Sequence, residues 1–254
     1  MNSPSSNPPQ KNKETQASSV YARLRHDVIS TALPPGQKLG IRELQARYGV
    51  GLNPMREALN RATNDGLVRQ SDLRGFYAAP VSAQDLVELT KARCLLTEVC
   101  LRESIQNGDA AWEEAIVVAH HRLSRTQRHA PGHTDALTFN PEWEAAHRAF
   151  HCSLIAACGS SWLLDTDSQL FDAADRYRHL ARRSALSGTA ARPDQHQEIM
   201  QAVLDRNVVH ATALLLAHYQ RTAEHGLKAL ASEAQADGAK AARAPKREHA
   251  SKRT

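Results

Sequence analysis

The sequence predicts a mainly α chain, in which a winged helix-turn-helix domain precedes an all-α bundle of six to seven helices. Three observations predict this class. Residues 42–59 have the pattern of two short helices joined at glycines. Residues 66–78 have the pattern of two short strands joined at a polar turn. From Ser82 onward, apolar residues recur at helical spacing and no stretch favours a strand.

The first domain is expected over residues 19–80. Its leading helix has an apolar stripe and ends at Pro34-Pro35-Gly36. A second helix follows, and Gly49 permits the backbone angles of the tight turn after it. Asn53 is expected to cap the next helix, and Pro54 to occupy its first position, where the missing N–H costs nothing.

The outward side of that helix would meet DNA, because a helix of this motif lies in the major groove. Arg56 falls on this side, and Asn53 lies at the helix N-terminus, where base edges or phosphates are met. Arg74 and Gly75 lie near the expected tip of the wing. The expected DNA-contacting residues are therefore Arg42, Asn53, Arg56, Arg74 and Gly75.

The charge is unevenly distributed along the chain, whose formal net charge is +5. Residues 20–80 carry nine Arg/Lys against five Asp/Glu, and residues 240–254 carry six against one. Residues 81–239 carry a compensating net charge of −5. A basic domain tied to a larger acidic one indicates a local phosphate-binding surface.

The composition also bears on the tails and on the compartment. Residues 1–18 and 232–254 are polar or basic and are expected to be disordered. The four cysteines form no CxxC pair, which favours free thiols in a reducing cytoplasm. No apolar run is long enough for a membrane span, and no signal peptide is evident.

The second domain is expected over residues 82–231, with Ser82 capping its first helix. Arg93 lies on the inward stripe of that helix, where a guanidinium must be paired or reach a cavity. It is either part of an internal salt bridge or an anion clamp for a carboxylate ligand. Further helices are expected at roughly 109–128, 141–158, 160–186, 194–206 and 208–231.

Histidines form the second signal in this domain. His147 and His151 are four residues apart and so share one helix face, while His196 and His218 lie on later helices. Four such imidazoles could hold a divalent transition metal, zinc or nickel, or they could be ordinary core and surface histidines. His120 is expected to be exposed. No glutamate accompanies the pair as in HExxH, which argues against a metalloenzyme.

The order of these elements resembles a known family. Residues 24–76, with Pro34 to Leu39 and the run Pro54-Met55-Arg56-Glu57-Ala58-Leu59, resemble the N-terminal domain of GntR-family bacterial transcription regulators. Residues 82–230 resemble the all-helical FCD effector domain of the FadR subgroup. The segments around His196 and Trp143 are most similar to a branch that resembles CsiR, a regulator linked to dicarboxylate and amino-acid-derived carbon use.

The resemblance implies DNA contacts by Arg42, Arg56 and Gly75, and carboxylate binding by Arg93. It also implies metal or effector contacts by the histidines, and the expected effector residues are Arg93, Tyr177 and Arg178. Two positions depart from the family pattern. Gly51-Leu52-Asn53 stands where relatives often have Ser-Arg-Thr, and His147 stands where many have aspartate.

Together these features predict a cytoplasmic, homodimeric regulator, a repressor and not an enzyme. It would bind a palindromic double-stranded operator and respond to a small carboxylate in its helical domain. The alternative that the sequence leaves open is an architectural DNA-binding protein without an effector.

Overall fold

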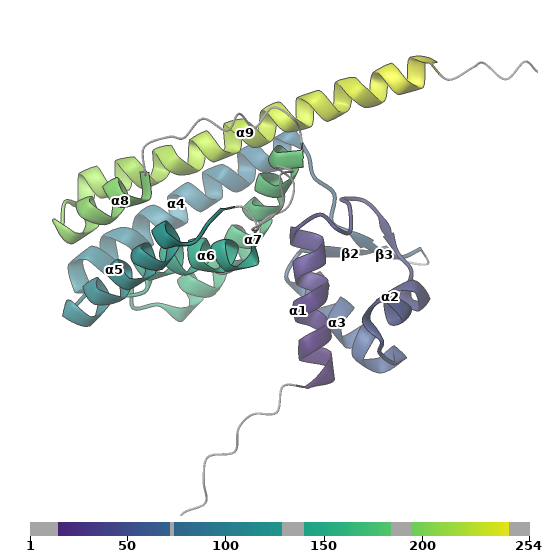
Figure 1. Cartoon of the computed structure of the whole chain (residues 1–254), viewed down its shortest axis with the longest axis horizontal. Helices are drawn as coiled ribbons and strands as arrows, with labels where there is room; N and C mark the ends of the chain where they lie inside the picture. Colours follow the sequence, from purple (N-terminus) through teal and green to yellow (C-terminus); the bar gives the residue numbers. More distant parts are fainter. Residues whose placement is uncertain (1–14, 72–73, 129–139, 184–194, 244–254) are drawn as a thin grey trace, which may run out of the picture. The chain divides into compact units, whose positions relative to one another are not determined.

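The structure is a computed structural model that describes residues 15–71, 74–128, 140–183 and 195–243. It divides into two compact units, residues 1–80 and 81–254, each of which is described by itself (Figure 1). The predicted mainly α class is confirmed. Most of both expected tails, residues 1–14 and 244–254, lies outside the described residues.

The first unit is a winged helix-turn-helix. Its elements are α1 (Gln16–Ile29), β1 (Lys38–Leu39), α2 (Ile41–Tyr48), α3 (Leu52–Asn64), β2 (Val68–Ser71) and β3 (Gly75–Ala78). The strands form an antiparallel sheet in the order β1-β3-β2, so that β2 and β3 make the wing. A core of side chains from all three helices and the sheet, with Leu24, Met55 and Leu59 at its centre, is fully buried.

The expected start of α3 is wrong by two residues. The helix begins at Leu52 with Gly51 as its N-cap, and no side chain caps it. Asn53 is therefore a residue of the first helical turn and not the cap. Pro54 is tolerated there, because N–H groups of the first turn have no acceptor within the helix. The turn before it matches expectation, since Gly49 ends α2 with a left-handed φ of +68°.

The second unit is a bundle built from α4 (Ala83–Asn107), α5 (Ala110–Arg125), α6 (Pro141–Ile155), α7 (Ser161–Arg183), α8 (Gln195–Leu204) and α9 (Val208–Arg243). Side-chain oxygens of Ser82, Asp109 and Asn140 cap α4, α5 and α6. Helix α4 packs against α9, α7 and α6. Where α9 crosses α4, Gly226 allows a close approach, because a Cβ there would lie 2.8 Å from Leu86.

Two expectations for this unit need correction. Helix α9 continues to Arg243, so residues 232–243 are helical and not a disordered tail (Figure 1). Their alanine-rich sequence has a high helix propensity, and a helix already formed extends more easily than a new one nucleates. His120 is buried and not exposed, because its ring packs edge-on against Phe150 at 5.6 Å. None of the described helices is long and apolar enough to cross a membrane.

Candidate functional site

In the first unit, the residues expected to contact DNA are all exposed, and they come from three elements. Arg42 lies in the first turn of α2, Asn53 and Arg56 lie in α3, and Arg74 and Gly75 lie at the wing. Within the described part of the chain, the guanidiniums of Arg42, Arg56 and Arg74 have no hydrogen-bond or ion-pair partner. Such groups keep their full capacity to bind phosphate or guanine.

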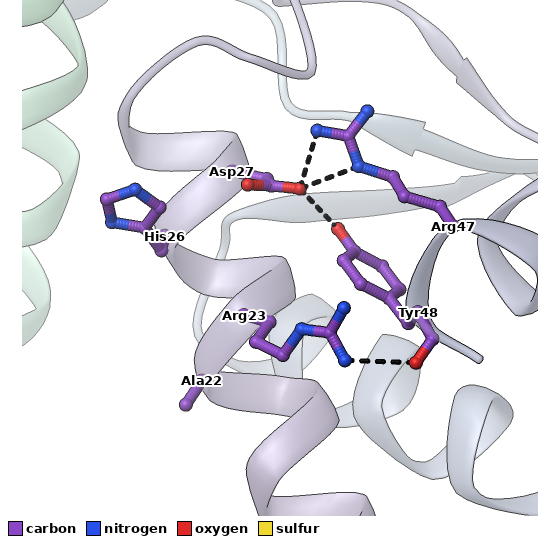
Figure 2. Close-up of a pocket in the computed structure, with 6 residues that line it drawn as sticks. All are labelled: Ala22, Arg23, His26, Asp27, Arg47 and Tyr48. Carbon is purple, nitrogen blue, oxygen red and sulfur yellow. Dashed lines mark hydrogen bonds and ion pairs between the residues drawn. The ribbon is translucent and has the colours of Figure 1, made fainter. Parts of the chain in front are cut away.

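Other arginines of the same unit are engaged in holding it together. Figure 2 shows Arg23 of α1 donating to the carbonyl of Tyr48 at 2.9 Å, and Arg47 of α2 bonding Asp27 at 2.8 Å. The Tyr48 hydroxyl also donates to Asp27 at 2.8 Å, and burial followed by this hydrogen bond raises the pKa of Tyr48. In α3, Arg61 lies over the Tyr21 ring at 4.3 Å.

A hollow of about 460 Å³ opens between α1 and α2 at these residues (Figure 2). Its size suits a small ligand, but pockets that bind such molecules are mostly apolar with a few convergent polar groups. Here the charged groups of Arg23, Asp27 and Arg47 already satisfy one another or the backbone. We therefore assign these contacts to the attachment of α2 to α1.

The wing depends on a glycine. Gly75 has a φ of +94°, and the N–H of Arg74 donates to the carbonyl of Ser71 at 3.1 Å to close the turn. A residue with a Cβ would be strained at this φ. Gly75 therefore fixes the shape of the turn that presents Arg74.

In the second unit, the four predicted histidines converge. His147 and His151 come from α6, His196 from α8 and His218 from α9. One ring nitrogen of each lies within 4.8 Å of the others, and the Nε2 atoms of His147 and His151 are 3.2 Å apart. The His147 ring stacks on Trp143 with 4.8 Å between centroids.

Burial keeps these imidazoles neutral. Desolvation, followed by the neighbouring histidines and by Arg93 or Arg178, holds the pKa values of His147 and His151 well below 6.5. Burial, with His196 as the next cause, lowers the pKa of His218 to about 3. Neutral imidazoles are the form that binds metal ions.

The residues present fit a divalent transition metal. Two nitrogens that bind one zinc at about 2.0–2.1 Å lie about 3.4 Å apart in a tetrahedral site, close to the 3.2 Å between His147 and His151. The Nδ1 of His218 lies 3.2 Å from the amide oxygen of Gln195, which leaves the His218 Nε2 lone pair for the ion. The donor set is nitrogen only, which suits zinc or nickel better than magnesium or calcium.

The three residues expected to bind an effector line one cavity. Arg93 of α4 and Tyr177 and Arg178 of α7 border it, as do residues of α9. The cavity has room for about 20 Å³, enough for one water molecule, so a carboxylate would enter only after side chains move. This cavity adjoins the histidine cluster, because Arg93 and Arg178 both depress the pKa of His151 after burial and the neighbouring histidines.

Arg93 differs from its two neighbours in the cavity. Tyr177 donates its hydroxyl hydrogen to Asp85, and Arg178 pairs with Asp175 at 2.8 Å and with Glu144. The guanidinium of Arg93 is only 8% exposed and lies over the rings of Tyr219 and Phe171, at 3.8 and 4.8 Å.

The Nε of Arg93 has no hydrogen-bond partner among the described residues. A buried guanidinium held by aromatic faces and lacking a carboxylate partner is suited to an anionic ligand. Of the two interpretations of Arg93, the structure therefore favours the anion clamp over the internal salt bridge.

Sequence reasoning missed three residues that shape this region. Gln195 orients His218, Trp143 stacks on His147, and Tyr219 lies under Arg93. Gln195 directly precedes His196, and Tyr219 directly follows His218. Their position beside predicted ligands was a usable signal, whereas the stacking of Trp143 depends on side-chain direction that spacing does not give.

A winged helix-turn-helix joined to a helical domain with a buried polar site defines a class, that of DNA-binding transcription regulators with an effector domain. Comparison with family models specifies it. Residues 16–77 match the gntR family of bacterial regulatory proteins, and residues 88–221 match the FCD domain. The chain belongs to the GntR family, with an FCD domain as its second unit, and it is a regulator and not an enzyme.

Individual relatives agree with this assignment. The chain is 36% identical to the HTH-type transcriptional regulator BphR of Paraburkholderia xenovorans, over 79% of this chain and 81% of that protein. It is 33% identical to the HTH-type transcriptional repressor GlaR of Escherichia coli K12, over 78% of this chain and 90% of that protein.

Solved structures share the fold. E. coli McbR/YncC is 16% identical and superposes with a TM-score of 0.66, over 86% of this chain and 98% of that one. A GntR-type regulator of Rhodococcus sp. RHA1 is 21% identical with a TM-score of 0.63, over 84% and 98%.

Proposed function

We propose that this chain is a homodimeric, ligand-responsive repressor that binds a palindromic operator and senses a small carboxylate. Its relative GlaR is described as a repressor, which supports that sign of regulation. Two recognition helices related by a two-fold axis would bind two half-sites about one helical turn apart. Operator binding would place its action in the cytoplasm, where bacterial chromosomes lie.

In the DNA complex, we assign Arg42 and Arg74 to phosphates, which position the domain without reading sequence. Arg56 lies one turn into α3 and would reach a base edge, with Asn53 beside it at the helix N-terminus. Leu52 is 42% exposed on the same turn and supplies no hydrogen bond. Arg56 and Asn53 would therefore carry most of the base reading by α3.

In the helical domain, Arg93 would bind the carboxylate of the effector through paired N–H···O bonds. The four histidines would hold a divalent ion beside it, and the ion would supply a fixed positive charge that attracts the same anion. Because no carboxylate belongs to the histidine cluster, neither Arg93 nor the ion would be neutralised before the effector binds.

Regulation requires that the effector bind two arrangements of the protein with different affinity. The 20 Å³ cavity is too small for a carboxylate, so binding would displace side chains of α4, α7 or α9. We propose that this displacement favours an arrangement of the dimer that binds the operator less tightly.

The observation that carries this proposal is Arg93, a buried guanidinium whose Nε has no protein partner, next to four converging histidines. A thermal-shift screen tests it, with acetate, succinate and gluconate added to protein with and without a chelator. One of these acids is expected to raise the melting temperature of the wild type and not that of Arg93→Met. If no acid shifts the wild type, the sensor is rejected in favour of an effector-independent DNA-binding protein.

A further inference from the structure

One face of α4 is apolar and uncovered in the second unit. Val87, Leu95 and Val99 follow one another at intervals of eight and four residues, so they lie along one line of the helix. Their exposed fractions are 52%, 59% and 37%. The opposite face, which carries Leu86 and Arg93, is the one that packs against the bundle. Leucine and valine in a row along 12 residues of exposed helix mark an interaction surface.

Four charged residues lie on the same side of α4, and their order is informative. Glu88 and Lys91 precede Leu95, and Glu98 and Arg102 follow it, so the signs run minus, plus, minus, plus. Glu88 and Arg102 are each seven residues from Leu95, and Lys91 and Glu98 are four and three away. Each charge on one side of Leu95 therefore has an opposite charge at the matching distance on the other side.

We propose that α4 pairs antiparallel with α4 of a second copy of this chain, about a two-fold axis at Leu95. In this register Leu95 meets Leu95 of the partner subunit, and Glu88 lies opposite Arg102 of the partner subunit. Lys91 would lie near Glu98 of the partner subunit. A two-fold axis repeats each contact, so the interface has four opposite-charge pairs around a central leucine contact.

The charges also select the direction of pairing. A parallel pair of α4 helices would set Glu88 against Glu88 and Arg102 against Arg102 of the partner subunit, and like charges in contact oppose association. Glu98 and Arg102 can also pair within one helix, as residues four apart do. That local pairing does not bury Leu95, whereas the antiparallel dimer does.

The segment from Glu88 to Arg102 spans about 21 Å of helix, at about 1.5 Å per residue. This proposal rests on the homodimer of the proposed function and specifies which surface forms it. Because α4 also carries Arg93 on its inward side, a ligand that displaces Arg93 would act on the helix that joins the two copies.

Cysteine crosslinking tests the register directly. In a Cys94→Ala background, which removes the neighbouring thiol, Leu95→Cys places one thiol of each copy on the two-fold axis. We expect a disulfide-linked dimer on a non-reducing gel after mild oxidation. The matched control is Cys94→Ala with Val118→Cys, an apolar α5 position that is 47% exposed and outside the proposed contact. It is expected to stay monomeric on the same gel.

Charge reversal gives a second test that does not depend on thiols. Glu88→Arg sets like charges against Arg102 of the partner subunit and is expected to weaken the dimer several-fold in analytical ultracentrifugation. Arg102→Glu should act in the same way, and the double variant should restore the wild-type dissociation constant, since both charges are then exchanged.

The outcomes separate this inference from the proposed function. If the wild type is a dimer but Leu95→Cys does not crosslink, or if Val118→Cys crosslinks instead, the α4 interface is wrong and the dimeric regulator stands. If the full-length wild type is monomeric both free and on operator DNA, the α4 interface and the homodimer of the proposed function are both overturned.

Discussion

The Nδ1 of His218 and the amide oxygen of Gln195 lie 3.2 Å apart, which joins the last helix of the bundle to the first residue of α8. Since the amide oxygen can only accept, the proton of His218 belongs on Nδ1, and the lone pair of Nε2 points elsewhere. This contact sets the orientation of one of the four clustered imidazoles, so Gln195 is a positioning residue for the candidate metal site.

Gln195→Ala is expected to lower the affinity for Zn²⁺ by about 10- to 100-fold, the usual cost of losing a group that orients a ligand. Competition with a chromophoric chelator measures this affinity. The matched control is Gln197→Ala, an exposed position on the same helix, which should bind Zn²⁺ as the wild type does. Equal affinities for all three proteins would show that Gln195 does not orient the site.

Arg93→Met is expected to abolish the melting shift caused by the responding acid without lowering the melting temperature of the ligand-free protein. The reason is that methionine keeps apolar bulk over Tyr219 and removes a buried charge that lacks a partner carboxylate. Differential scanning calorimetry measures both quantities.

Arg148→Met is the matched control for Arg93→Met. It breaks the ion pair with Asp172, so it should lower the melting temperature and keep the response to the acid. An acid response that survives in Arg93→Met would contradict the assigned clamp.

The stability of the metal-free protein is expected to fall in acid. His147, His151 and His218 have folded-state pKa values below the 6.5 of an unfolded histidine, that of His218 being about 3. Below pH 6.5 the unfolded chain therefore binds more protons than the folded one, and the free energy of unfolding decreases as pH falls towards 3. Each histidine contributes on the order of 1 kcal/mol per pH unit.

Urea titrations between pH 7 and 4 with chelator present measure this slope. His218→Gln should reduce the slope, whereas His210→Gln should leave it unchanged, because His210 is exposed on the same helix. If the unfolding free energy is flat from pH 6.5 to 4, the histidines are not buried in their neutral form.

In α3, Arg56→Ala is expected to weaken operator binding by about 1–3 kcal/mol, the range for loss of a base-contacting arginine. Fluorescence anisotropy at several salt concentrations measures it. Arg61→Ala is the control, because Arg61 bonds Ser18 and lies over Tyr21. It should lower stability by about 0.5–1 kcal/mol and leave DNA affinity unchanged. The reverse pattern would assign DNA contact to the wrong arginine.

Much of the fold could be predicted because its signals are local. Gly49 ends α2 in the left-handed conformation that its position after an apolar stripe indicates, and Ser82 caps α4 as its sequence context indicates. The start of α3 was misplaced because Asn53 is a good capping residue in isolation, whereas the extended backbone of Gly51 already begins the helix there.

The candidate site was predictable only in part, for a related reason. Helical spacing places Arg93 and His151 on inward faces, and the structure finds both buried. Which helices face each other is a long-range property, so spacing did not show that Tyr219 lies under Arg93. It also did not show that Phe150 covers His120.

The central claim is that a carboxylate bound at Arg93 controls DNA binding, and one anisotropy measurement tests it most directly. Labelled DNA from upstream of the chain's own gene is titrated with full-length protein, with and without whichever of acetate, succinate or gluconate most raises the melting temperature. The account predicts that this acid weakens binding to that DNA at least five-fold in the wild type and not in Arg93→Met. Identical binding curves with and without the acid in the wild type would contradict it.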